Sequence, residues 1–186
     1  MVPVTSLWLP ILVASVIVFV ASFILHMVLP WHRSDYRRLP SEDEVMESLR
    51  RFNIAPGDYA MPSVSEPKEM SSPAFIEKMK RGPVAFLTFR KPGPPTMAPS
   101  LAQWFVFTVV VGVFAAYLTG RALGPGTTYL GVFRFAGTTA YLGYGLAMIP
   151  NSIWMGRQWS STLRSQVDAL IYGLLTAGAF GWLWPR

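Results

Sequence analysis

The amino-acid sequence predicts an all-α membrane protein, a bundle of four transmembrane helices with a small α+β cytoplasmic insertion between the first and second helices. Hydrophobic residues make up 52% of the chain and charged residues only 14%, whereas soluble domains carry about 25% charge. The apolar residues are gathered into four blocks of roughly the 20 residues that span a bilayer. Most of the charges fall in one segment, 30–100. The chain has no cysteine, which excludes disulfides, thiolate metal sites and thiol nucleophiles.

Four apolar blocks are expected to be the transmembrane helices. The first lacks basic residues ahead of it and is longer than the apolar core of a signal peptide, so we interpret it as a retained helix. The third carries Arg134, and the fourth carries Arg164 and Asp168. The predicted organisation is therefore a first transmembrane helix in 1–29, a cytoplasmic segment in 30–100 and helices two to four in 101–186. The four blocks are 7–29, 101–120, 128–149 and 163–184.

The distribution of basic residues predicts the orientation. Segment 30–100 holds 11 of the 16 lysines and arginines. Because cytoplasmic loops are enriched in these residues, this segment is expected in the cytoplasm and both termini outside. The basic residues closest to the helix ends agree with this assignment: Arg33, Arg37, Arg38, Arg90 and Lys91.

The cytoplasmic segment is expected to have secondary structure of its own, because structureless loops of this length are uncommon. Ser41 and Glu44 have the spacing of a capping box before a short amphipathic helix. Ser72, Pro73 and Gly82 mark the start and end of a second helix. The stretches "GDYAMPS" and "PVAFLTFR" have the composition of short strands, which either pair as a hairpin or lie along the membrane surface. The proline-rich stretch 91–100 is a stiff connector.

Small residues repeat every four positions on two of the predicted helices. Such stripes let helix backbones approach closely in a membrane. Glycine and alanine are also common in membrane helices for no specific reason, but the strict register favours packing. The predicted packing positions are Gly112, Ala116 and Gly120 on the second helix, and Ala169, Gly173, Ala177 and Gly181 on the fourth.

Both histidines lie where the first helix meets the cytoplasmic edge. His26 and His32 are six residues apart across a proline, so they cannot share a helical face as an i,i+4 metal pair does, and no adjacent residue completes a ligand set. The sequence therefore predicts no metal site and no cofactor. The surrounding residues are expected to anchor the chain on anionic headgroups or to contact a partner: Trp31, His32, Arg33, Arg37 and Arg38.

His26 and Asp168 are expected at similar depths below the cytoplasmic edge. At 1.5 Å per residue, both lie within about 8 Å of that edge. Ionisable groups inside a membrane usually face the bundle interior, so we predict a buried polar clasp assisted by Asn151, Ser152 or Arg164. A proton or substrate relay and the absence of any contact are the alternatives. Arg134 is too far from Asp168 along the membrane normal for a direct pair. It is expected to reach headgroups or a partner's acidic group.

Several motifs carry a resemblance over nearly the whole chain. "LHMVLPWHRSDYRRLP", "LGPGTTYLGVFRFAGTTA", "PNSIWMGRQW" and "TAGAFGWLWPR" resemble a family of four-span bacterial inner-membrane proteins that has no assigned activity. The resemblance implies a bacterial inner-membrane location and this fold. It implies no catalytic residue.

Three classes of function are open at this point. The first is an accessory or stabilising subunit of a larger membrane complex of the respiratory or photosynthetic type, with lipids and other membrane subunits as partners and no role for nucleic acid. The second is a small proton-linked transporter or channel that acts as a homo-oligomer and uses His26 and Asp168. The third is a membrane enzyme, which the missing cysteines, histidine cluster and paired carboxylates disfavour. We therefore expect no enzymatic activity.

Overall fold

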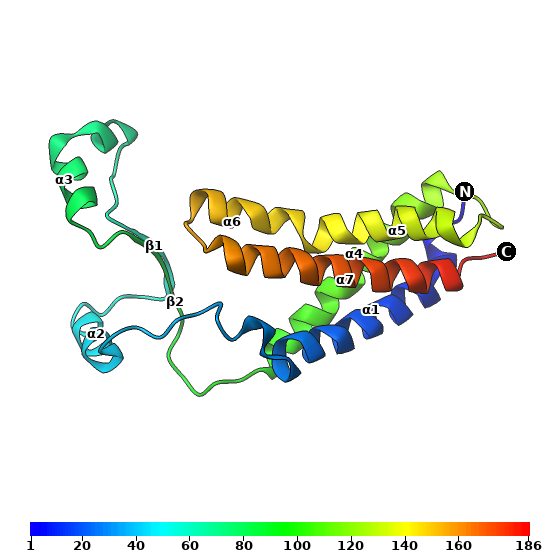
Figure 1. Cartoon of the computed structure of the whole chain (residues 1–186), viewed down its shortest axis with the longest axis horizontal. Coiled ribbons are helices and arrows are strands. Elements are labelled where there is room, and N and C mark those ends of the chain that lie inside the picture. Colours follow the sequence, from blue (N-terminus) through cyan, green and yellow to red (C-terminus); the bar gives the residue numbers. More distant parts are fainter. The chain divides into compact units, whose positions relative to one another are not determined.

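The computed structural model describes residues Met1–Arg186 and divides into two compact units (Figure 1). The helical unit comprises residues 1–36 and 96–186, and the insertion unit comprises residues 37–95. The chain is mostly helical and contains one small two-stranded sheet, in agreement with the predicted combination of helices and an α+β insertion.

The helical unit contains two long helices, two helices of 16 residues and one short helix. α1 (Trp8–Phe23) is followed by a π-helical turn, Ile24–Val28. The others are α4 (Ala98–Ala122), α5 (Tyr129–Tyr144), α6 (Ile149–Trp154) and α7 (Trp159–Trp182). Two helical stretches are long and apolar enough to cross a membrane, Val4–Val28 and Ala98–Ala122.

The third predicted block is not one continuous helix. α5 ends at Tyr144, and a 3-10 turn (Leu146–Met148) precedes α6. Gly145 lies so close to α7 that an added Cβ would come within 2.9 Å of the Ala169 Cβ. Pro150 then lies in the first turn of α6, where its missing N–H costs nothing. A glycine and a proline therefore divide this block into two helices.

α5 and α7 form the closest helix pair in the helical unit. An added Cβ on Gly173 would lie 3.1 Å from the Gly137 carbonyl oxygen, and one on Gly137 would lie 2.8 Å from the Ala177 Cβ. A Cβ added at Gly181 would lie 2.7 Å from the ring of Tyr129. The small residues of the fourth block therefore lie at this seam, as the stripe predicted.

The small residues of the second block face α1 and the chain ahead of it. Gly112 packs against Ile11, with 3.2 Å between an added Cβ and the Ile11 side chain. Ala116 is fully buried. Gly120 accepts a hydrogen bond from the Val2 N–H at 2.8 Å. α4 thus uses the predicted small residues to contact α1 and the first residues of the chain.

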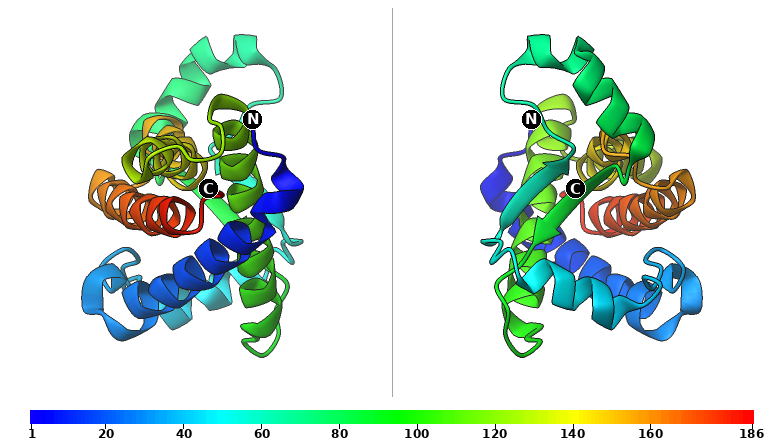
Figure 2. Two further views of the ribbon diagram at one scale, coloured as in Figure 1. Left: turned by 90° about the vertical axis from the view of Figure 1, so that its right-hand side faces the viewer. Right: turned by 90° about the vertical axis from the view of Figure 1, so that its left-hand side faces the viewer.

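Both termini lie at the same end of the helical unit (Figures 1 and 2). Besides the Val2 to Gly120 bond, the Gly126 N–H donates to the Pro185 carbonyl at 3.0 Å. The buried Trp184 donates from Nε1 to the Gly124 carbonyl at 3.0 Å. The last turn of α4 therefore holds the N-terminal residues, and the loop after it holds the C-terminal residues.

The insertion unit contains α2 (Glu42–Arg50), β1 (Gly57–Met61), α3 (Pro73–Arg81) and β2 (Ala85–Phe89). β1 and β2 pair antiparallel, with Tyr59 opposite Leu87, so the two predicted strands pair with each other. The Ser72 side chain accepts a hydrogen bond from the Phe75 N–H, as predicted. The predicted capping box at Ser41 is wrong, since Ser41 adopts a left-handed conformation (φ 46°) and its side chain caps nothing.

Candidate functional site

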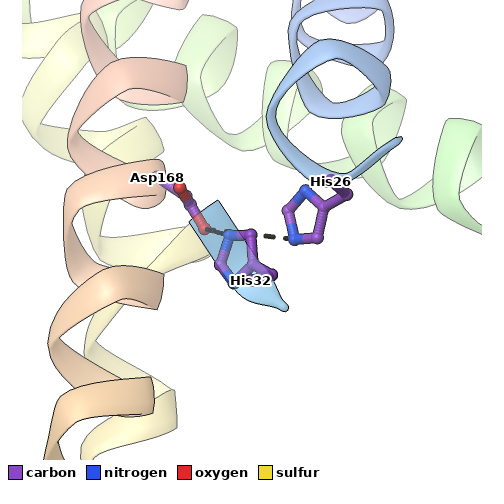
Figure 3. A group of neighbouring side chains, drawn as sticks. All are labelled: His26, His32 and Asp168. Carbon is purple, nitrogen blue, oxygen red and sulfur yellow. Dashed lines mark ion pairs between the residues drawn. The ribbon is translucent and has the colours of Figure 1, made fainter. Parts of the chain in front are cut away.

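Five polar and charged side chains meet where α1 ends beside the first turns of α7. We call them the polar cluster: His26, His32, Asp35, Arg164 and Asp168. Figure 3 shows three of them, with His32 between His26 and Asp168. The two carboxylate side chains are the most buried members, at 5% exposed for Asp168 and 7% for Asp35.

The end of α1 explains how two histidines six residues apart come together. The π-helical turn closes with a hydrogen bond from the Leu29 N–H to the Ile24 carbonyl. Pro30 cannot continue the helix, and a 3-10 turn over Pro30–His32 follows an extended Leu29. The chain folds back, and the rings of His26 and His32 stack with centroids 4.2 Å apart and planes at 8°.

Asp35 joins this turn to α7. Its Oδ2 accepts a hydrogen bond from His32 Nδ1 at 2.6 Å, and its Oδ1 accepts one from the Arg164 guanidinium. Burial alone would raise the pKa of Asp35, but the hydrogen bonds from His32 and Arg164 outweigh it and hold the pKa below its ordinary value. Asp35 is therefore a carboxylate that orients His32.

Asp168 lies one helical turn beyond Arg164 and on the same face of α7. Its Oδ2 is 2.8 Å from His32 Nε2 and 4.0 Å from His26 Nε2. The His32 contact is close, but its angle is not that of a hydrogen bond, and His32 Nε2 and Asp168 Oδ1 both lack a hydrogen-bond partner. Two buried polar atoms of the cluster are therefore unsatisfied.

Both imidazoles turn the same nitrogen toward Asp168. His26 Nδ1 lies 3.0 Å from the Ser22 carbonyl, which can only accept, so Nδ1 must carry a proton. His32 Nδ1 is held by the Asp35 carboxylate in the same way. In a neutral ring the proton on Nδ1 leaves a lone pair on Nε2. With neutral rings, both Nε2 atoms present lone pairs to a carboxylate, an arrangement that a proton or a metal cation between them completes.

The structure does not join His26 and Asp168 by the direct hydrogen bond that the predicted clasp requires. His26 and Asp168 are near each other, but 4.0 Å is longer than a hydrogen bond. His32, predicted as a headgroup anchor, is instead the direct neighbour of Asp168, and its side chain is only 13% exposed. Asn151 takes no part, because it is exposed and only its backbone carbonyl bonds, to the N–H groups of Met155 and Arg157.

The remaining predicted contact residues lie on the surface. Trp31 and Arg33 are exposed in the helical unit, and Arg134 is exposed on α5. Arg37 and Arg38 belong to the insertion unit, where Arg38 pairs with Glu42 at 2.9 Å. These positions are exposed, and their contact with headgroups or partners stays a prediction.

Sequence reasoning missed Asp35 as a member of the cluster, whereas it named Arg164 among the residues expected to assist the clasp. The spacing of Arg164 and Asp168 places both on one helical face. Asp35 is 129 residues from Arg164, so nothing in the sequence joins the two.

Comparison of the chain with protein families, curated proteins and solved structures finds no match.

Proposed function

We propose that this chain is a four-span bacterial inner-membrane protein that acts as an accessory subunit, binding lipids and other membrane subunits without catalysing a reaction. The observation that supports the proposal is the apolar outer surface of the helical unit. Large apolar side chains are exposed on all four of its major helices: Val16, Val20 and Phe23 on α1, Val106 and Phe114 on α4, Leu130 and Phe135 on α5, and Leu170 and Leu174 on α7. An exposed apolar surface of this kind marks a membrane or protein interface.

The exposed side chains of α5 and α7 support the assignment of four spans. These two helices pack on each other through small residues and turn Leu130, Phe135, Leu170 and Leu174 outward. In a membrane, helices associate through small residues at the contact and leave larger apolar residues to lipid. The pattern on α5 and α7 is therefore that of membrane helices.

A complex of the respiratory or photosynthetic type is the partner class we propose. The interior of the helical unit is filled by small residues and by a packed aromatic group that includes Trp104, Tyr144 and Tyr172. The outer apolar faces remain available to neighbouring subunits. The exposed Arg33 and Trp31 lie beside the end of α1, where anionic headgroups would meet them.

Native purification tests this proposal. The full chain, tagged after Arg186 and expressed at its natural level, is extracted with a mild detergent and its co-purifying proteins are quantified by mass spectrometry. We expect a fixed stoichiometric set of other membrane proteins. A homo-oligomer alone would contradict the proposal and favour the transporter or channel alternative.

Substitutions on the outer face sharpen the test. Phe114→Ala and Val106→Ala on α4 are compared with Leu170→Ala and Leu174→Ala on α7, because all four side chains are exposed. We expect one pair to release the partner set while all four variants keep the thermal stability of the isolated chain. Retention of every partner in all four variants would place the interface away from both helices.

A further inference from the structure

We propose that His26, His32 and Asp168 bind one divalent transition-metal ion through the two imidazole Nε2 atoms and a carboxylate oxygen. This inference goes beyond the proposed function and does not depend on it. One ligating atom from each residue lies within 4.8 Å of the other two. Two imidazoles and one carboxylate form a ligand set that suits Zn²⁺ and Fe²⁺, and Zn²⁺ is the probe we choose.

The neighbours of the two histidines support metal binding. A metal-ligating histidine usually donates its second ring N–H to a carboxylate or a backbone carbonyl, which fixes the ring and its tautomer. His32 has the carboxylate of Asp35 in this position at 2.6 Å, and His26 has the Ser22 carbonyl at 3.0 Å. Both Nε2 lone pairs are therefore available on the side that faces Asp168.

The buried Asp168 supplies an independent observation. Its side chain is 5% exposed, and its Oδ1 has no hydrogen-bond partner. With neutral imidazoles, the two carboxylates and the Arg164 guanidinium leave the cluster with one net negative charge. Burying an uncompensated negative charge is costly. A divalent cation compensates it and leaves one net positive charge, next to the half-exposed His26.

Metal binding requires a small adjustment of the two rings. With metal–ligand distances of about 2.1 Å, tetrahedral ligand atoms lie about 3.4 Å apart. The two observed distances to Asp168 Oδ2, 2.8 Å from His32 and 4.0 Å from His26, lie on either side of that value. His26 must tilt out of its stacked position, and its side chain is free to do so because it is 47% exposed.

Three protein ligands leave a coordination position open. Structural zinc sites usually have four protein ligands, whereas sites with three hold a water or an exogenous ligand in the fourth position. The half-exposed His26 lies at the accessible edge of the cluster, so an exogenous fourth ligand can reach the metal from there. The rival occupant is a proton on His32, which would neutralise the cluster.

Zinc binding by the purified full chain distinguishes a metal from a proton. The chain is produced with a tag that contains no histidine, stripped with a chelator and dialysed against increasing Zn²⁺, and bound zinc is measured by elemental analysis. We expect one equivalent per chain. His26→Gln should weaken binding at least tenfold, and Asp35→Asn should weaken it roughly 10- to 100-fold because it removes the orienting carboxylate.

Two control variants distinguish zinc bound at the cluster from zinc bound elsewhere on the chain. His26 and His32 are the only histidines and there is no cysteine, so His26→Gln/His32→Gln reports the background from exposed carboxylates. Asp43→Asn, an exposed position on α2, should bind zinc as the wild type does. If the wild type binds no more zinc than the double variant, the cluster holds only a proton and the proposal is wrong.

A second readout does not depend on His32, whose replacement could impair folding. Zn²⁺ should raise the thermal unfolding temperature of the wild-type chain, since a ligand that binds only the folded state stabilises it. The increase should be lost in His26→Gln, whose half-exposed side chain is not needed for packing. An equal increase in both chains would show that zinc acts elsewhere and would overturn the assignment.

Discussion

Trp104 connects the aromatic core of the helical unit to the polar cluster. Its ring packs against Tyr144 and Tyr172, with centroids 6.2 Å and 6.0 Å away. Its Nε1 donates to Ser22 Oγ at 2.8 Å, and the carbonyl of Ser22 holds His26. A core side chain thus fixes the residue that orients a cluster histidine.

Replacing Trp104 by Phe should lower the free energy of unfolding by about 0.5–1.5 kcal/mol, the usual net contribution of one hydrogen bond, plus a smaller loss of packing. Thermal unfolding in detergent measures the change. Trp182→Phe is the matched control, because Trp182 is exposed at the end of α7. Equal losses in the two variants would contradict a specific role for the Trp104 to Ser22 bond.

At the residue scale, sequence reasoning was informative where position along a helix was the signal. The positions of His26 and Asp168 along their helices placed them near each other, and the structure agrees. It failed for His32 because the chain reverses at Leu29 and Pro30, and no periodic pattern encodes that reversal. Asn151 was chosen for its position alone, and it is exposed with no side-chain hydrogen bond to the cluster.

At the scale of elements, the seam between α5 and α7 provides a direct test of close packing. Gly173 and Gly178 lie on the same helix but have different amounts of space around them. A Cβ added at Gly173 would lie 3.1 Å from the Gly137 carbonyl oxygen, whereas one added at Gly178 would lie 3.8 Å from its nearest neighbour, Tyr129. Alanine favours a helix over glycine by about 1 kcal/mol. Gly178→Ala should therefore stabilise the chain or leave it unchanged, whereas Gly173→Ala should destabilise it.

Thermal unfolding of both variants in the same detergent measures this difference, and Gly173→Leu should be worse than Gly173→Ala because a larger side chain separates the backbones further. Gly173→Leu with wild-type stability would show that the seam tolerates separation.

The two short helices of the insertion unit offer a matched pair of caps. Ser72 accepts a hydrogen bond from the Phe75 N–H at 3.2 Å, whereas Ser41 makes no such bond at the start of α2. Ser72→Ala should destabilise the first turn of α3 by about 1 kcal/mol, and Ser41→Ala should have a smaller effect on α2. Amide hydrogen exchange at the two helix starts measures both. Faster exchange in Ser41→Ala than in Ser72→Ala would contradict this assignment.

The elements themselves were largely predictable, and their interruptions were not. Long apolar blocks predicted α1, α4 and α7, because length and hydropathy are properties of the local sequence. The break after Tyr144 depends on how closely Gly145 approaches Ala169 on another helix. The capping box at Ser41 matched in spacing but not in backbone conformation.

At the scale of the molecule, the helical unit has two chemically different ends. Both chain termini and the loop between α4 and α5 lie at one end. α1 runs from that end to the polar cluster, which lies where the chain leaves α1 for the insertion unit. Four of the five basic residues near the predicted helix ends, Arg37, Arg38, Arg90 and Lys91, lie at the two ends of the insertion unit. If the helical unit spans a membrane, its orientation determines which compartment supplies a cation to the cluster.

We expect both termini outside and the insertion unit in the cytoplasm, because positively charged residues next to membrane helices are retained on the cytoplasmic side. A fluorescent protein inserted near Pro67 should fluoresce, and alkaline phosphatase fused after Arg186 should be active, since each reporter works only in the compartment predicted for it. Replacing Arg33, Arg37 and Arg38 together by Gln should weaken this bias and give a mixed signal from both fusions, while Arg134→Gln, an exposed position on α5, should change neither. The opposite pattern, with an active phosphatase near Pro67 and a fluorescent fusion after Arg186, would reverse the orientation and place the polar cluster on the outer side, where zinc from outside the cell would reach it.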